Sequence, residues 1–199
     1  MPDDGAQHGR RMARKKAAVD AAIARAERDK GLLLVLTGNG KGKSSSAFGM
    51  LARTLGYGFK AGVAQFIKNR RDTGEEAFFA SHPSVQWHVL GDGFTWDTQN
   101  READIASARR GWEVARAMLQ DATLHLVVLD ELTYLLNYDY LDAQQVCADL
   151  AARPPMQHVV VTGRAAPECL LAMADTVSEL RDVKHAFRDG VRAQPGIDL

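Results

Sequence analysis

The sequence predicts an α/β domain built on a mostly parallel β-sheet that is flanked by helices. From residue 31 onward, short apolar runs alternate with longer stretches of helical periodicity. Most of these apolar runs are continuous rather than alternating, as in strands that helices cover on both faces. A glycine-rich turn also joins the first apolar run to the first helical stretch. Together these three observations predict parallel strands connected by helices.

The apolar runs place six strands, and the periodicity between them places four helices. We expect strands at residues 32–37, 61–67, 85–90, 124–130, 158–162 and 176–180. We expect helices at 43–56, after the glycine-rich turn, and at 101–120, where Ile105, Ala108, Trp112, Ala115 and Leu119 form one stripe. A third helix, over 141–152, ends before Pro154-Pro155, and a short one over 167–174 opens at Pro167, because proline favours the first helical turn.

Residues 1–30 differ in composition from the rest and predict a basic N-terminal arm ahead of a single domain over 31–199. This stretch holds eight Lys or Arg against five Asp or Glu. An Ala-rich part, 17–26, carries Val19 and Ile23 four residues apart and predicts a thin amphipathic helix. Two interpretations stay open: the arm is solvated and partly disordered, or it becomes ordered over a ligand or a partner subunit.

The overall composition excludes several classes of protein. The chain has 199 residues, 46% of them hydrophobic, with Lys+Arg 25 against Asp+Glu 25. These values exclude collagen-like, disulfide-scaffold and wholly disordered chains, and the zero net charge argues against a nucleic-acid partner. Short apolar runs and the absence of a secretory pattern predict no membrane partner and a cytoplasmic location. Cys147 and Cys169 fit no metal spacing and no disulfide framework, as expected in a reducing compartment.

The glycine-rich turn has the chemistry of a phosphate-binding P-loop. It lies between a predicted strand and a predicted helix, which is the context that a P-loop requires. Glycines allow backbone N–H groups to point inward at phosphate oxygens, and the helix adds its positive N-terminal end. Lys43 would reach the terminal phosphates, and the Ser44 hydroxyl would bind Mg²⁺. The residues predicted to bind nucleotide here are Gly38, Asn39, Gly40, Lys41, Gly42, Lys43, Ser44 and Ser45. The turn therefore predicts a P-loop NTPase-like (RecA-like) fold.

This turn departs from the usual P-loop spacing. Three residues rather than four separate Gly38 from Gly42-Lys43, and Thr37 stands where the first glycine normally lies. Lys41 adds a second cation inside the loop. The shortened loop leaves the orientation of the nucleotide open.

Charged side chains at other strand ends extend the predicted site. Asp130 and Glu131 follow the strand 124–130, and carboxyl ends of parallel strands meet at the edge where ligands bind. Carboxylate oxygens are suitable ligands for Mg²⁺, so Asp130, Glu131 and Ser44 are the metal candidates. Arg164 follows the strand 158–162 as a possible triphosphate contact, and Arg53 on the first helix is a further nucleotide candidate. These residues do not separate a hydrolase from a transferase.

An unusual aromatic turn lies between two of the predicted elements. Phe94 and Trp96 follow glycines and stand among polar turn residues. In an extended segment, residues two apart project to the same side, so both rings could face one large flat ligand. The alternative is that both rings pack into the hydrophobic core, which is the commoner location for aromatic side chains.

At several of these motifs the sequence resembles the P-loop type ATP:corrinoid adenosyltransferases, specifically the cob(I)yrinic acid a,c-diamide adenosyltransferases. The matching segments span most of the chain from residue 31 onward. They are Gly38-Asn39-Gly40-Lys41-Gly42-Lys43-Ser44, Gln65-Phe66-Ile67-Lys68, residues 93–102, Leu129-Asp130-Glu131-Leu132-Thr133-Tyr134, Val161-Thr162-Gly163-Arg164, residues 174–180 and Lys184-His185-Ala186-Phe187. Ser44 and Ser45 stand where the family usually has threonine. Serine retains the hydroxyl group of threonine.

The resemblance implies an activity that spacing alone does not reveal. It implies that a reduced corrinoid attacks the 5′ carbon of ATP and that triphosphate leaves, in adenosylcobalamin biosynthesis or salvage. It implies that ATP and the corrinoid are substrates, that Mg²⁺ is bound at Ser44 and Glu131, and that Phe94 and Trp96 pack under the corrin ring. An external reductant for Co(II), such as a flavoprotein, and a homodimer are also implied.

The residues themselves leave two other functions open. Asp130, Glu131 and the Lys/Ser cradle would also suit a P-loop ATPase or kinase, which would transfer phosphoryl groups without a corrinoid. The basic cluster between Arg10 and Lys16 would suit a nucleotide-gated module that binds nucleic acid, although the balanced charge lowers this expectation. The sequence does not identify the preferred corrinoid among the a,c-diamide, cobinamide and cobalamin.

Overall fold

The computed structural model describes residues 4–67, 73–91 and 100–197, and it divides the chain into two compact units, 1–30 and 31–199. In the second unit the strands are β1 (Leu33–Thr37), β2 (Lys60–Gln65), β3 (Val85–Val89), β4 (Leu124–Asp130), β5 (His158–Thr162) and β6 (Thr176–Glu179). The helices are α2 (Lys43–Gly56), α3 (Gly74–Phe79), α5 (Arg101–Gln120), α6 (Leu132–Asn137), α7 (Ala143–Ala151), α8 (Glu168–Met173) and the 3₁₀ turn η1 (Ala186–Asp189).

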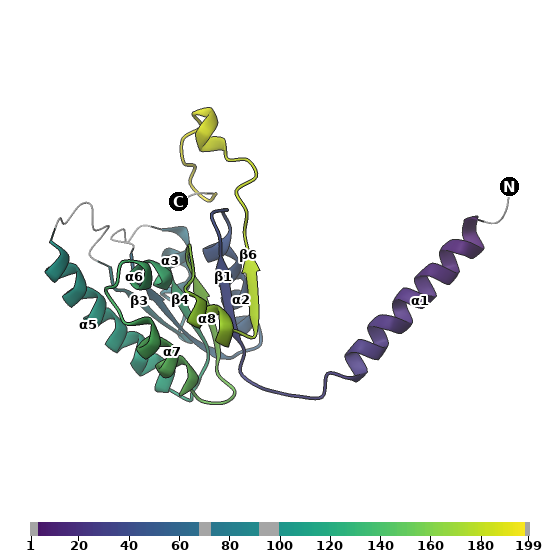
Figure 1. Cartoon of the computed structure of the whole chain (residues 1–199), viewed down its shortest axis with the longest axis horizontal. Coiled ribbons are helices and arrows are strands. Elements are labelled where there is room, and N and C mark those ends of the chain that lie inside the picture. The colour runs from purple at the N-terminus through teal and green to yellow at the C-terminus, as the bar shows by residue number, and fades with distance from the viewer. Residues whose placement is uncertain (1–3, 68–72, 92–99, 198–199) are drawn as a thin grey trace. The chain divides into compact units, whose positions relative to one another are not determined.

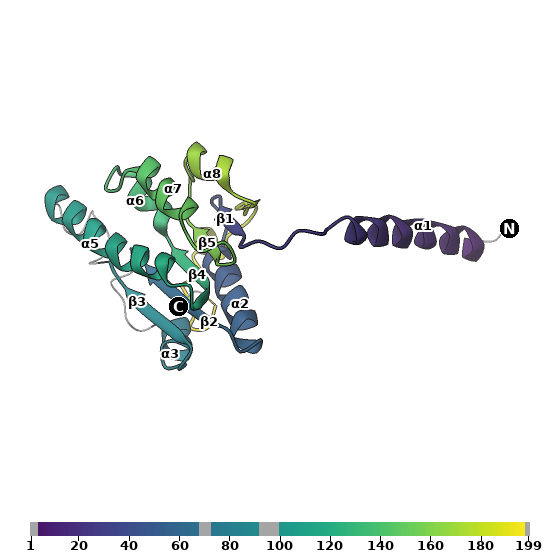
Figure 2. The same ribbon diagram turned by 90° about the horizontal axis from the view of Figure 1, so that it is seen from below.

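The strands form one six-stranded sheet in the order β3-β2-β4-β5-β1-β6. Every strand pair is parallel, which confirms the predicted α/β class with a sheet between helices. Helices α2 and α3 cover one face, and α5, α6, α7 and α8 cover the other, as Figures 1 and 2 show. Two hydrophobic clusters result, one on each face, so the central strands β4, β5 and β1 are buried on both sides.

Most predicted elements agree with the structure to within two residues at each end. Helix α5 begins where Asn100 caps it by accepting a hydrogen bond from the Ala103 N–H, and Asp142 caps α7 in the same way. Helices α3 and α6 and the turn η1 were not predicted, because each has six residues or fewer and shows too little periodicity to be recognised.

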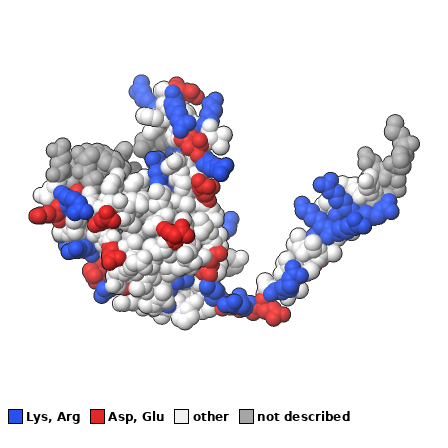
Figure 3. All heavy atoms as spheres, in the orientation of Figure 1, with Lys and Arg blue, Asp and Glu red and all other residues white. Residues whose placement is uncertain are grey.

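The first unit contains one helix, α1 (Asp4–Ala24), which corrects the expected range of 17–26. The helix begins earlier than expected: residues 10–16 are Arg, Met, Ala and Lys, which have high helix propensity, and a Lys16–Asp20 ion pair of 2.6 Å adds support. Basic side chains gather along it in Figure 3. Met12, Val19 and Ile23 are all about half exposed or more within this unit. Among the described residues, no helix has both the length and the apolar character needed to cross a bilayer.

Candidate functional site

The glycine-rich turn lies at the carboxyl edge of the sheet, between β1 and α2. Gly38 and Gly42 have φ angles of 95° and 103°, in the left-handed region that glycine adopts without strain. Gly42 is the N-cap of α2 and supplies no side-chain hydrogen bond to the first turn. The uncapped N–H groups at this helix start therefore remain suited to an anion.

Lys43 spans the turn from the first position of α2. Its Nζ donates hydrogen bonds to the carbonyl oxygens of Gly38, at 2.9 Å, and Gly40, at 2.7 Å. Partial burial lowers the pKa of Lys43, and the Arg164 guanidinium lowers it further, while the carboxylates of Glu131 and Asp130 oppose the shift. The structure thus concentrates positive charge at the turn, as binding of a polyphosphate requires.

The glycines of the turn also permit a close backbone contact with the segment that follows β6. The Gly40 N–H donates to the Leu180 carbonyl at 2.7 Å, and the Leu180 N–H donates to the Thr37 carbonyl at 2.8 Å. A Cβ on Gly40 would lie 2.6 Å from the Arg181 carbonyl oxygen, which is closer than real Cβ contacts. The sequence predicted these glycines from phosphate binding alone, whereas the fold also needs them for packing.

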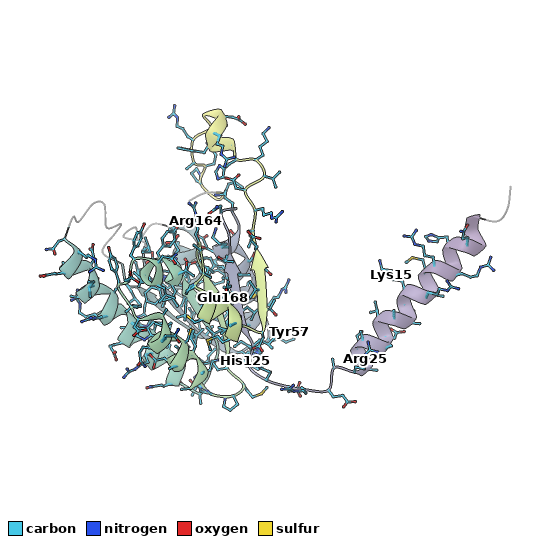
Figure 4. The ribbon with its side chains drawn as sticks, viewed as in Figure 1. Lys15, Arg25, Tyr57, His125, Arg164 and Glu168 are labelled. Carbon is cyan, nitrogen blue, oxygen red and sulfur yellow. The ribbon has the colours of Figure 1, made fainter. Side chains whose placement is uncertain are left out.

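A cavity of about 580 Å³ opens beside the turn and brings most of the predicted residues together. Every predicted nucleotide residue from Asn39 to Ser45 lines it, together with Glu131 and Arg164. In Figure 4, Arg164 lies at the sheet edge from which the C-terminal segment rises, whereas His125 and Tyr57 lie at the opposite edge. The predicted P-loop, one of the two strand-end acids and the predicted arginine therefore share one concave surface.

The two neighbouring acids have different environments. Asp130 is completely buried, does not line the cavity, and accepts hydrogen bonds from Gln65 and Thr162. Glu131 has a φ of 63°, which is rare for a residue other than glycine, and its side chain lines the cavity. Of the pair, Glu131 is therefore the residue in position to meet a ligand.

Arg164 projects from a turn that several side chains hold in place. Its carbonyl oxygen accepts hydrogen bonds from Thr133 Oγ1 at 2.7 Å and from Asn137 Nδ2 at 2.9 Å. The Ala166 N–H donates to Thr37 Oγ1, at the end of β1, at 3.3 Å. These contacts attach the Arg164 turn to α6 and to the start of the P-loop. They therefore fix the position of the Arg164 backbone relative to the P-loop.

Three other predicted residues lie elsewhere or outside the described residues. Arg53 is exposed in the last turn of α2 and does not line the cavity. Phe94 and Trp96, the predicted corrinoid-binding residues, fall within 92–99, outside the described residues.

Sequence reasoning missed several residues that line the cavity. Asp182 and His185 come from the segment after β6, and Tyr134 comes from α6. Asp182 also pairs with Arg188 at 2.5 Å, which helps to order the segment, and Figure 3 shows basic and acidic side chains mixed there. Burial raises the pKa of Tyr134, so its hydroxyl stays protonated and can donate. His185 and Tyr134 lie within segments that carried the family resemblance. The resemblance therefore included both residues, but it did not indicate that they line the site.

The oxygen groups at the cavity fit Mg²⁺ better than a transition metal. Ser44 and Glu131 both line it and offer a hydroxyl and a carboxylate, which are hard oxygen ligands. Among the described residues, no group of three or more His, Cys, Asp and Glu side chains forms a metal cage. Mg²⁺ typically needs only one or two protein ligands, because phosphate oxygens and water complete its coordination.

Comparison with known proteins gives a consistent result over the whole chain. The model of the family described as ATP:corrinoid adenosyltransferase BtuR/CobO/CobP matches residues 29–199. The chain is 56% identical over 199 residues to a corrinoid adenosyltransferase of Pseudomonas aeruginosa, covering 100% of this chain and 98% of that protein. It is 50% identical over 192 residues to the corrinoid adenosyltransferase of Escherichia coli, covering 96% of this chain and 97% of that protein. Corrinoid adenosyltransferase CobA of Salmonella typhimurium is 49% identical, with the same coverage.

Proposed function

The chain belongs to the ATP:corrinoid adenosyltransferase family, and on that premise we propose that it transfers the 5′-deoxyadenosyl group of ATP to the cobalt of a reduced corrinoid. The corrinoid would be cob(I)yrinic acid a,c-diamide, cobinamide or cobalamin, and the product would serve adenosylcobalamin biosynthesis or salvage. The observation that supports this best is the shared cavity, in which the predicted P-loop, Glu131 and Arg164 surround one space.

The proposed reaction is a displacement at carbon rather than at phosphorus. The electron pair of Co(I) forms a cobalt–carbon bond with the ribose C5′, and the bond from C5′ to the triphosphate oxygen breaks, so triphosphate leaves with that electron pair. The metal centre of the substrate is the nucleophile, so the enzyme needs no Ser, Cys or His nucleophile. Its tasks are orientation of ATP and stabilisation of negative charge on the leaving triphosphate.

The residues of the cradle are suited to those tasks. The N–H groups of the turn and of the α2 start would hold the triphosphate, with Lys43, Lys41 and Arg164 adding positive charge. Mg²⁺, when bound, would be held by Ser44 and Glu131 and would neutralise further charge on the triphosphate. Holding the triphosphate in this way would turn the ribose C5′ toward the corrinoid.

We further propose an external reductant such as a flavoprotein, a homodimer and a cytoplasmic location. Residues 1–30 would form an arm that is either partly disordered or ordered on ligand binding, attached to a single P-loop domain over 31–199. The amphipathic pattern of α1, with Met12, Val19 and Ile23 on its surface, supports an arm with a binding role. Its test is proteolytic protection of residues 1–30 when ATP and corrinoid are both added.

Product analysis tests the proposed reaction directly. Incubation with ATP, Mg²⁺ and chemically reduced corrinoid is expected to yield the adenosylated corrinoid, seen in the visible spectrum, and one equivalent of triphosphate. ATP without corrinoid is the control and is expected to remain intact. ADP and phosphate as main products, formed with or without corrinoid, would instead identify an ATPase or kinase.

We predict that Phe94→Ala combined with Trp96→Ala impairs turnover from Co(II) corrinoid more than turnover from pre-reduced Co(I). The physical reason is that an apolar aromatic wedge would exclude the lower axial ligand, and a cobalt that keeps that ligand is harder to reduce. Rates from the two starting oxidation states measure the effect. The matched control is Tyr57→Ala, an exposed aromatic at the sheet edge opposite Arg164. Equal losses from both oxidation states would contradict the wedge assignment.

A further inference from the structure

A chain of buried hydrogen bonds crosses three neighbouring strands and reaches the cavity at Thr162, which lines it. Gln65 Nε2, at the end of β2, donates to Asp130 Oδ2 at 3.1 Å. Thr162 Oγ1, at the end of β5, donates to Asp130 Oδ1 at 2.7 Å. The same Thr162 oxygen accepts a hydrogen bond from the Glu131 N–H at 2.9 Å. Gln65, Asp130 and Thr162 are at most 1% exposed, so the chain of bonds is shielded from water.

Packing alone does not account for these polar residues. A buried carboxylate and a buried amide cost free energy that well-packed apolar side chains would avoid. Gln65 also leaves one polar atom unsatisfied, since its buried Oε1 accepts no hydrogen bond among the described residues. The Gln65 atom that does form a hydrogen bond is Nε2, which donates to Asp130. The arrangement therefore orients Asp130 at a cost in folding stability.

The chain of bonds ends at Glu131, whose backbone lies in the left-handed region. Glu131 has a φ of 63°, and a residue other than glycine retains such a conformation only when its surroundings hold it. Its N–H is held by Thr162 Oγ1, whose proton is directed at Asp130 and whose lone pair is therefore free to accept. Glu131 lines the cavity together with Lys43 and Arg164, and its carboxylate is near enough to raise the pKa of Lys43.

We propose that Gln65, Asp130 and Thr162 are positioning residues that hold the Glu131 carboxylate toward the phosphate cradle and thereby set the Mg²⁺ affinity of the ATP complex. Gln65 and Thr162 fix the two oxygens of Asp130, Asp130 fixes the Thr162 hydroxyl, and that hydroxyl fixes the Glu131 backbone. The effect on Mg²⁺ rests on the proposed function, because it requires that Glu131 meets the metal. The effect on the Glu131 backbone does not require it.

Thr162→Val and Thr162→Ser form the central comparison. Valine keeps the shape of threonine and removes the hydroxyl, whereas serine keeps the hydroxyl and removes a methyl group. ATP affinity is measured by calorimetry with Mg²⁺ and with EDTA, without corrinoid. We expect valine to reduce the Mg²⁺-dependent gain in ATP affinity by about 10- to 100-fold and to leave the affinity in EDTA near the wild-type value. We expect serine to preserve the gain.

Backbone amide exchange at Glu131 supplies an independent measurement. We expect faster exchange in Thr162→Val than in the wild type and in Thr162→Ser, because only valine removes the acceptor of the Glu131 N–H. Gln65→Met keeps side-chain length, removes the donor to Asp130, and is expected to shift both measurements in the direction of valine. Gln65→Met also tests the proposal if the Thr162→Val variant does not fold.

Two results would overturn the proposal. One is an equal loss of the Mg²⁺ response in the serine and valine variants, which would assign the effect to packing of the methyl group. The other is Glu131 exchange that is the same in all of the variants. A wild-type protein whose ATP affinity does not respond to Mg²⁺ would refute the proposed metal site instead, and the exchange rates would still decide the positioning role.

Discussion

Lys43→Ala is expected to reduce adenosyl transfer by about 10²- to 10³-fold, the range seen when an enzyme loses one preorganised charge-stabilising donor. The Lys43 ammonium donates to the Gly38 and Gly40 carbonyls, and Lys43 lines the cavity that Glu131 and Arg164 also line. Its removal takes away positive charge where the leaving triphosphate would develop negative charge. Turnover and the Kd for ATP, measured on the same preparation, show how the loss divides between binding and chemistry.

The matched control for Lys43→Ala is Lys60→Ala. Lys60 is an exposed lysine at the start of β2 and does not line the cavity. Its substitution by alanine therefore removes the same charge from the protein without altering the cavity. We expect Lys60→Ala to retain wild-type turnover. Equal activity of the wild type and Lys43→Ala would remove Lys43 from the site.

The pH dependence of ATP binding tests the same lysine. Burial and the Arg164 guanidinium lower the pKa of Lys43, so the free enzyme loses this charge at a lower pH than an ordinary lysine would. Triphosphate prefers the protonated lysine, and ATP affinity should therefore fall as the pH rises through that pKa. Titrations over alkaline pH should show a larger fall in the wild type than in Lys43→Ala, which keeps Lys41 in the cavity lining.

Gly163→Ala is expected to destabilise the protein and to reduce activity together. Gly163 has a φ of 144°, and a Cβ placed there would lie 1.9 Å from Thr133 Oγ1. The strained backbone and the overpacking each cost about 1–3 kcal/mol. Each kcal/mol lowers Tm by about 2–4 °C in a domain of this size. The clash also displaces the Thr133 hydroxyl, which donates to the Arg164 carbonyl and so positions that arginine.

Two further variants separate the causes of this effect. Gly58 also has a positive φ, 75°, but a Cβ there would meet nothing within 4 Å, so Gly58→Ala measures backbone strain alone. Adding Thr133→Ala to Gly163→Ala removes the clashing hydroxyl and is expected to restore part of the lost Tm. Thermal unfolding of the four proteins gives the comparison. A Gly163→Ala protein no less stable than Gly58→Ala would refute the steric explanation.

The family resemblance and the fold class could be predicted from the sequence because both depend on local patterns. Apolar runs produced the six strands within two residues at their ends. The central strands β4, β5 and β1 were clearest, since strands buried on both faces need apolar side chains at every position. The long helices α2 and α5 were equally clear, because each repeats its apolar face over several turns. Short helices such as α6 were missed, because six residues carry little periodicity and packing determines them.

The candidate site was predicted in part, for a related reason. A P-loop binds phosphate largely through backbone groups of contiguous residues, so residues 38–45 could be recognised from their order alone. Asp130 and Glu131 have the same charge and are adjacent in sequence, so local pattern did not distinguish their roles. Their difference depends on Thr162 and Gln65, which reach them from other strands.

By itself, the sequence determined that this chain has alternating strands and helices, a phosphate-binding turn and acids at a strand end. Only the tertiary structure decided that Asp130 is buried within a network while Glu131 faces the cavity, and that Asp182 and His185 join the site from beyond β6. The physical reason is that hydrogen bonds between strands depend on which strands become neighbours. Strand order brings β2, β4 and β5 side by side, although their residues lie far apart in the chain.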